Sequence, residues 1–152
     1  MSVHDTPFAI ITGASRGIGA EYARALASRH YDLLLVSRDE KRLRHLASEL
    51  REKHNVEVMV ELLDLSQTNA ANHLYIAAKN HREKVDVLIN NCRFPLSKPF
   101  EVLSVEEWTG VMDQNATCAF NLSQILGREM LSNGKGRIIH ILSGLAERGL
   151  GN

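Results

Sequence analysis

A glycine-rich turn near the start of the chain places the strongest constraint on its fold. The apolar run Phe8–Ile11 is predicted to be a buried strand, and apolar residues with helical spacing begin at Ile18. The turn between them carries Gly13, Gly17 and Gly19. Glycines let the backbone approach a phosphate, and the first turn of a helix offers unpaired N–H groups and the positive end of a dipole. Strand, glycine turn and helix in this order therefore predict a phosphate-binding site.

The rest of the chain alternates strand and helix patterns. Further strands are predicted over Asp32–Ser37, Val56–Leu62, Val85–Ile89 and Ile138–Leu142. The intervening helices are predicted to be capped by Asp39, Ser66 and Ser104. After Ser104 one long helical stretch is predicted, with Val111, Asn115 and Cys118 on its inner side. This alternation predicts one α/β domain over residues 1–152, a Rossmann-like, doubly wound parallel sheet of strand order 3-2-1-4-5 with helices on both faces.

Composition excludes several classes of function. The 18 basic and 18 acidic residues cancel, so no overall positive field favours a nucleic-acid partner. The sequence has no signal-peptide pattern and no apolar run of membrane-spanning length, so we expect a cytoplasmic protein without a membrane partner. Cys92 and Cys118 lack metal-ligand spacing and the seven histidines are scattered, so we expect reduced cysteines and no metal site.

Polar residues and a glycine recur where the predicted strands end. Gly13, Ser37, Asp64, Asn91 and Ser143 all fall at or just past such an end. Parallel sheets of this kind bind ligands outside the carboxyl ends of their strands, where the strand order reverses. We therefore expect these five residues to line one site.

The motifs along the chain resemble those of the short-chain dehydrogenase/reductase family. The glycine spacing is Gly13-x-x-x-Gly17-x-Gly19, and Asp64-Leu65 is similar to the family's adenine-contacting pair. Asn90-Asn91-Cys92-Arg93 resembles its Asn-Asn-Ala-Gly motif, and Asn115 lies where the family keeps an active-site asparagine. The run Gly136 to Ser143 resembles the strand that delivers its catalytic serine.

This resemblance implies a nicotinamide cofactor and hydride transfer between a small carbonyl and an alcohol substrate. Ser143 would hydrogen-bond the substrate oxygen, and Asn115 would hold a helix irregularity and a water of the proton relay. The predicted site contains no metal ligands. Its catalytic residues are Ser143 and Asn115, and its cofactor-binding residues are Gly13, Ser15, Arg16, Gly17, Ile18, Gly19, Ser37, Arg38, Asp64, Leu65 and Asn91.

The residues at the end of the second strand favour NADP (NADPH) over NAD. An acidic residue at the end of this strand hydrogen-bonds the ribose 2′-hydroxyl of NAD, whereas a basic residue binds the 2′-phosphate of NADP. Here Ser37 is followed by Arg38, and Arg16 in the glycine turn points to the same neighbourhood. The alternative is that both arginines are solvated surface residues, and Asp39 is either a ribose ligand or a helix cap. Arg93, where the family has glycine, either crowds the cofactor or contacts a phosphate.

The family's chemistry also needs a tyrosine acid with a lysine four residues later, on the helix after the serine strand. Tyr75 and Lys79 match this spacing but belong to the helix between the third and fourth strands, so we expect Tyr75 not to be catalytic. We expect the 152 residues to be incomplete at the C-terminal side of the domain and inactive as given. Three interpretations stay open: the amino-terminal or truncated part of an oxidoreductase, a dinucleotide-binding or partner-binding remnant, or a gene fragment. An uncovered edge at Ile138–Leu142 would favour homo-oligomers or a complementing chain.

Overall fold

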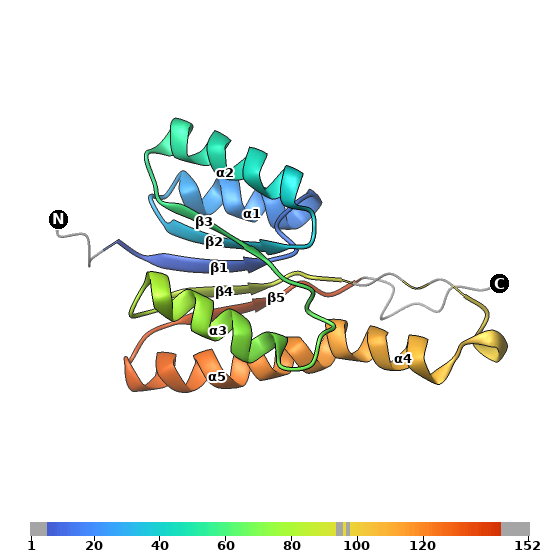
Figure 1. Ribbon diagram of the computed structural model, residues 1–152. Helices are drawn as coiled ribbons and strands as arrows, with labels where there is room; N and C mark the ends of the chain where they lie inside the picture. The colour runs from blue at the N-terminus through green and yellow to red at the C-terminus, as the bar shows by residue number, and fades with distance from the viewer. Residues whose placement is uncertain (1–5, 94–95, 97, 144–152) are drawn as a thin grey trace.

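Five parallel strands form one sheet in the order β3-β2-β1-β4-β5 in the computed structural model, which describes residues 6–93, 96 and 98–143 (Figure 1). The strands are β1 (Phe8–Thr12), β2 (Asp32–Ser37), β3 (Val58–Leu62), β4 (Val87–Asn90) and β5 (Arg137–His140). The helices are α1 (Gly17–Ala27), α2 (Glu40–His54), α3 (Ala70–His81), α4 (Val105–Met112) and α5 (Cys118–Ser132). A short 3-10 turn, η1 (Phe100–Val102), precedes α4, and a π-helical turn, η2 (Asp113–Thr117), joins α4 to α5. The predicted fold class and strand order are confirmed.

Helices cover both faces of the sheet, which explains why its central strands are continuous apolar runs. Figure 1 shows α1 and α2 on one face and α3 and α5 on the other. Because side chains alternate along a strand, Ile11 and Leu35 pack in the first layer, while Ile10 and Leu34 pack in the second. All residues of β1 are buried, so the end of this strand is a rigid support for the glycine turn that follows it.

Two of the three predicted helix caps are present. The carboxylate of Asp39 accepts a hydrogen bond from the Arg42 backbone N–H, 3.1 Å away, at the start of α2. Ser104 begins α4 with a capping box, in which Ser104 and Glu107 each bond the other's backbone N–H. The prediction for Ser66 is wrong, because α3 begins only at Ala70. The backbone N–H and hydroxyl of Ser66 instead donate to the Asp64 carboxylate, at 3.0 and 2.8 Å.

The long helical stretch after Ser104 is interrupted, and this changes which residues face inward. The π-helical turn η2 spaces its hydrogen bonds one residue wider than an α-helix does, so it rotates the following residues relative to the stripe predicted from sequence. Gln114 is consequently buried, with 3% of its surface exposed, and continues the inner stripe of Cys118 and Leu122. Asn115 was predicted on that inner side but is exposed. The helix irregularity expected at Asn115 is therefore present as η2, but the side chain that it buries is that of Gln114.

The strand β5 forms one edge of the described sheet. It pairs with β4 alone among the described strands, and its residues are half-buried or exposed. The strand is shorter than predicted, because it ends at His140. Within the described residues, no helix combines the length and apolar character needed to cross a membrane.

Candidate functional site

The glycine turn after β1 has a shape that only glycine permits at its two ends. Gly13 and Gly17 have φ angles of +63° and +56°, in the left-handed region that L-residues with a side chain rarely adopt. A Cβ on Gly19 would collide with the carbonyl oxygen of Gly13 and the side-chain amide of Asn91. The first turn of α1 can therefore lie directly against the loop, and the space above Gly17 stays open.

The N-terminus of α1 has neither a side-chain cap nor an acidic residue in its first turn. Its N-cap residue is Arg16, whose side chain makes no hydrogen bond to the helix. The first N–H groups of a helix and the positive end of its dipole are stabilised by an anion. An uncapped helix start above an open glycine turn fits a dinucleotide's diphosphate, which is the group that the sequence predicts here.

Asn91 and Thr12 hold the glycine turn against the end of β4. The Asn91 side-chain amide donates to the backbone oxygens of Thr12 and Gly13, each at 3.1 Å. The Thr12 hydroxyl accepts from the backbone N–H groups of Asn91 and Cys92, at 2.9 and 3.0 Å. This network gives Asn91 a clear positioning function for the turn, whatever contact it makes with a ligand.

A cleft of about 500 Å³ opens at the carboxyl ends of the strands and joins most of the predicted site. Of the predicted residues it is lined by Gly13, Ser15, Arg16, Gly17, Ile18, Ser37, Arg38, Leu65, Asn91 and Ser143. Three predicted residues do not line it. Gly19 is buried beneath the turn, and Asp64 faces Ser66 and Arg38. Asn115 lines a neighbouring cavity of about 40 Å³, together with Gln114 and His140.

Two arginines and two hydroxyls border the cleft where β2 ends. The Arg38 guanidinium lies 3.4 Å from the Asp64 carboxylate and is 56% exposed, so it is free to turn toward a ligand. The Ser37 hydroxyl donates to that of Ser15 at 3.0 Å, which joins the end of β2 to the glycine turn. Burial favours the neutral form of Asp64, but hydrogen bonds from Ser66 and the charge of Arg38 outweigh it and hold the pKa of this carboxyl below its usual value.

One polar pair in the cleft wall was not predicted from the sequence. The side-chain amide of Gln114 donates to the Cys92 sulfur at 2.9 Å, and both residues line the cleft. Burial raises the pKa of the Cys92 thiol, although the hydrogen bond from Gln114 opposes the shift. The amide oxygen of Gln114 is buried and accepts no hydrogen bond from any described residue. The sequence does show that Cys92 replaces the alanine of the family's motif, which marks this position as unusual. No pattern in the sequence indicated that Gln114 contacts it.

His140 is the last residue of β5, and Ser143 lies three residues beyond it. Ser143 lines the cleft with Ile141 and Leu142. His140 lies within 3.5 Å of the Asn90 amide and 3.4 Å of the Ser123 hydroxyl, so its ring belongs to a polar network between β4, β5 and α5. The structure thus brings Ser143 to the cleft and Asn115 to the cavity beside it.

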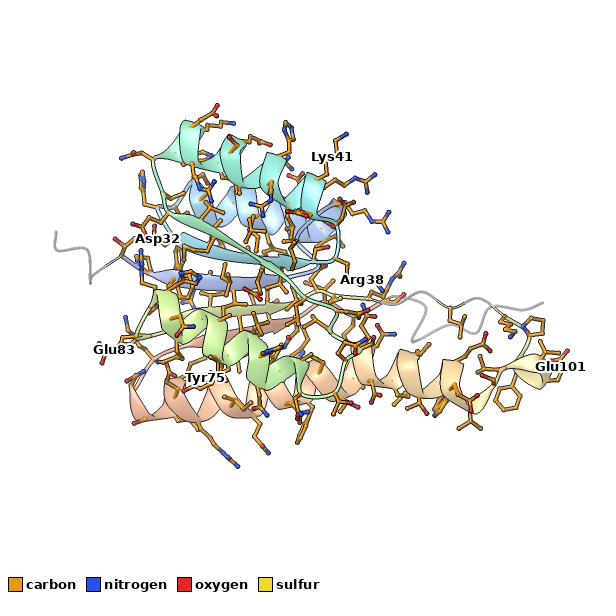
Figure 2. All side chains as sticks on the ribbon, in the orientation of Figure 1. Asp32, Arg38, Lys41, Tyr75, Glu83 and Glu101 are labelled. Carbon is orange, nitrogen blue, oxygen red and sulfur yellow. The ribbon has the colours of Figure 1, made fainter. Side chains whose placement is uncertain are left out.

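The Tyr75–Lys79 pair lies elsewhere and has a structural role. Both side chains bind Glu129 of α5, with distances of 3.4 Å from the Tyr75 hydroxyl and 3.0 Å from the Lys79 ammonium to the same carboxylate oxygen. Figure 2 shows Tyr75 on α3, away from the end of the sheet where Arg38 lies. Tyr22 and Tyr31 pack against the hydrophobic layer under α1 and α2. None of the three tyrosines lines the cleft.

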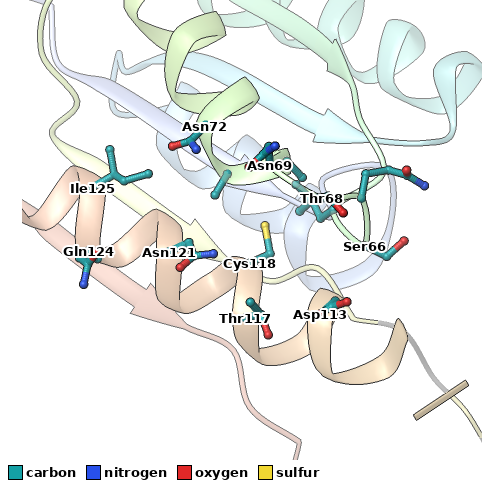
Figure 3. A pocket seen from close by; sticks show the side chains of 14 residues that line it. Ser66, Thr68, Asn69, Asn72, Asp113, Thr117, Cys118, Asn121, Gln124 and Ile125 are labelled. Carbon is teal, nitrogen blue, oxygen red and sulfur yellow. The ribbon is translucent and has the colours of Figure 1, made fainter. Parts of the chain in front are cut away.

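A second cavity, of about 430 Å³, lies between the loop before α3 and the helix α5 (Figure 3). Its wall is rich in amides and hydroxyls, among them Thr68, Asn72, Thr117 and Asn121. Leu65 lines this cavity as well as the cleft and separates the two. No motif had indicated this cavity, because its polar residues come from two distant stretches with no recognisable spacing.

Comparisons with known proteins agree with this geometry. The family model of short chain dehydrogenases matches residues 7–152. An oxidoreductase of Staphylococcus saprophyticus is 30% identical over 135 residues, which cover 89% of this chain. The short-chain dehydrogenase from Sphingobium yanoikuyae in complex with NADPH is 32% identical with a TM-score of 0.87, over 93% of this chain. L-sorbose reductase from Gluconobacter frateurii, complexed with NADPH and L-sorbose, is 27% identical with a TM-score of 0.90, over 97% of this chain.

The matches cover only part of those proteins. This chain spans 58% of the Staphylococcus relative, 55% of the Sphingobium chain and 56% of the L-sorbose reductase chain. The range matched by the family model, residues 7–152, contains the whole described sheet, the glycine turn and the residues that line the cleft. Family model, relatives and solved structures therefore agree on one assignment, and the chain belongs to the short-chain dehydrogenase/reductase family.

Proposed function

We propose that this chain binds NADP(H) in the cleft at the carboxyl edge of its sheet, as part of an oxidoreductase of the short-chain dehydrogenase/reductase type. The observation that carries the proposal is the combination of an uncapped α1 start with Arg16 and Arg38 on one cleft. The α1 N–H groups and the glycine turn would hold the diphosphate. Relatives of known structure that carry NADPH support the same reading.

The preference for NADPH over NADH follows from charge. A 2′-phosphate accepts paired, charge-assisted hydrogen bonds from a guanidinium, and no acid occupies the position after Ser37 that would favour a free 2′-hydroxyl. Arg38 is exposed, and its ion pair among the described residues is a 3.4 Å contact to Asp64, so breaking that contact to reach a phosphate has a small free-energy cost. Arg16 borders the same cleft from the glycine turn.

The cofactor would donate a hydride as NADPH to a small carbonyl substrate, or accept one as NADP⁺ from a small alcohol. Ser143 lines the cleft and would donate a hydrogen bond to the substrate oxygen as charge develops on it. Asn115, in the π-helical turn beside the cleft, would position a water for proton transfer. Because no tyrosine of the chain lies in the cleft, we expect the 152 residues to bind NADPH without reducing carbonyls. NADPH oxidation by the purified chain with any ketone would contradict this expectation.

Fluorescence titration with NADPH and NADH tests the cofactor proposal. Arg38→Ala should weaken NADPH binding by about tenfold or more and leave NADH binding within about twofold. Arg42→Ala is a matched control, since Arg42 is also 56% exposed and also lies 3.4 Å from a carboxylate, that of Asp39, but it does not line the cleft. Equal affinities of the unmodified chain for the two cofactors, or equal effects of the two variants, would refute the preference. No binding of either cofactor would refute the site.

A further inference from the structure

The second cavity, between the loop before α3 and the helix α5, has a polar wall that the protein itself does not use. Amide and hydroxyl side chains line it without a hydrogen bond to any described residue, namely those of Thr68, Asn69, Asn72, Thr117, Asn121 and Gln124. Ser66 on the same wall differs, because its hydroxyl donates to Asp64 at 2.8 Å. The cavity therefore carries hydrogen-bonding capacity that only water or a polar ligand can satisfy.

The buried residues that line this cavity are apolar. They are Leu65, Ala70, Ala71 and Cys118, and each is at most 5% exposed. A ligand in the cavity would therefore meet an apolar floor below and amides around its edge. A sugar or cyclitol ring has the same division, because C–H groups form its faces and hydroxyls project from its rim. Sites for small molecules combine apolar surface with a few polar groups in this way.

The charges around the cavity restrict the ligand further. Asp113 is the one charged residue among the described residues that line it, and no lysine, arginine, histidine or aromatic ring is among them. A phosphate or carboxylate would find no cation there and would be repelled by the Asp113 carboxylate. The cleft is different, since Arg16 and Arg38 both line it. The second cavity thus favours a neutral ligand.

Amides stand on both sides of the cavity. Figure 3 shows Asn72 from α3 on one side, and Asn121 and Gln124 from α5 on the other. Asn121 and Gln124 are three residues apart, so they lie on one face of their helix. An amide both donates and accepts hydrogen bonds, and so does a hydroxyl, so one amide can bind two neighbouring hydroxyls of a ring. The volume of about 430 Å³ lies in the range of small-molecule sites.

From these observations we propose that the second cavity binds a neutral, cyclic, polyhydroxylated ligand of the size of a monosaccharide or cyclitol. A C–H face of the ring would lie on Leu65 and Cys118, and its hydroxyls would bond Asn72, Asn121 and Gln124. The proposal does not depend on the cofactor cleft, from which Leu65 separates this cavity.

A titration with myo-inositol, followed through the backbone amide shifts in NMR spectra, tests the proposal. The shifts should saturate with a dissociation constant in the low millimolar range, as expected for a few hydrogen bonds to a small ligand. They should concentrate in residues 65–72 and 113–125 and not in the glycine turn. Inositol 1-phosphate should bind about fivefold more weakly, because its charge faces Asp113 without a cation nearby.

Variants of α3 identify the residues that bind. Asn72→Leu removes one amide from the wall and should weaken myo-inositol binding by about fivefold or more. Asn80→Leu is the matched control, because Asn80 is also an exposed asparagine of α3 but does not line the cavity. It should keep the affinity within about twofold of the unmodified chain. Thermal unfolding checks the fold of each variant, and Gln124→Leu on the opposite wall replaces Asn72→Leu if the latter does not fold.

Three results would overturn the proposal. The first is the absence of saturable shifts up to about 50 mM myo-inositol, which would refute the site. The second is a set of shifts in the glycine turn, or equal effects of Asn72→Leu and Asn80→Leu, which would place the ligand elsewhere. The third is tighter binding of inositol 1-phosphate than of myo-inositol, which would refute a neutral ligand. Failure to bind NADPH would refute the proposed function and leave this site standing.

Discussion

The helices α1 and α2 cover the same face of the sheet, yet their first turns are built in opposite ways. α2 has the Asp39 carboxylate on its backbone N–H groups and Glu40 in its first turn. α1 has an arginine at its N-cap, no side-chain cap and no acid in its first turn. α2 thus supplies negative charge at its own start, whereas the start of α1 at the cleft leaves that position open for an anion. Because α3 also lacks a side-chain cap and a first-turn acid, the missing cap of α1 indicates an anion site only together with the glycine turn before it.

The largest effect should come from filling the space under the α1 start. Gly19→Ala places a methyl group against the Gly13 carbonyl and the Asn91 amide, and neither can move without disturbing the turn. We expect a loss of about 2 kcal/mol or more in the free energy of unfolding, and loss of NADPH binding. Chemical denaturation and cofactor titration measure the two effects.

Gly110→Ala is the matched control for this change. Gly110 lies in α4, its φ is not positive, and nothing lies within 4 Å of the added methyl group. This variant should be more stable by about 0.5–1 kcal/mol, because alanine is the better helix former. If Gly19→Ala were as stable as Gly110→Ala, the close approach at the start of α1 would not exist.

A smaller effect should come from removing the cap of α2. Asp39→Ala deletes the acceptor of the Arg42 N–H and should cost about 1 kcal/mol in the free energy of unfolding. NADPH affinity should stay the same, because Asp39 does not line the cleft. Denaturant unfolding measures the first quantity and fluorescence titration the second. A weaker affinity without a stability loss would instead assign Asp39 to the cofactor ribose.

The parts that the sequence predicted well are those carried by local patterns. The strand Asp32–Ser37 was predicted with its observed bounds, because an apolar run between turn residues is recognisable on its own. The glycine turn and the cap at Asp39 also depend on a few neighbouring residues. The strand order followed from the alternation of strands and helices, since right-handed crossovers leave few arrangements.

The parts that it missed are local irregularities that a regular strand or helix pattern does not reveal. Ser66 has the chemistry of a helix cap, but Asp64 takes both of its donors and α3 begins later. The family resemblance predicted an irregularity at Asn115, but helical spacing alone does not show how a π-helical turn rotates its residues, so Asn115 was predicted inward and Gln114 was overlooked. Helix periodicity predicts a stripe correctly only while the helix stays regular.

The smallest expected effect on stability, and the sharpest comparison of the two helices, comes from giving α1 the cap that it lacks. Arg16→Asp places a carboxylate at an N-cap position whose backbone is already extended, as N-caps require. Without cofactor, this variant should be about 0.5 kcal/mol more stable than Arg16→Ala in denaturant unfolding, because the new carboxylate binds the free N–H groups of the first turn. With NADPH present, the order of the two variants in unfolding free energy should reverse, since the carboxylate occupies the proposed diphosphate position and repels the diphosphate. Arg16→Asp should therefore bind NADPH more weakly than Arg16→Ala does. If the aspartate raised stability and left NADPH affinity equal to that of the alanine variant, the open start of α1 would be an unfilled cap and not an anion site.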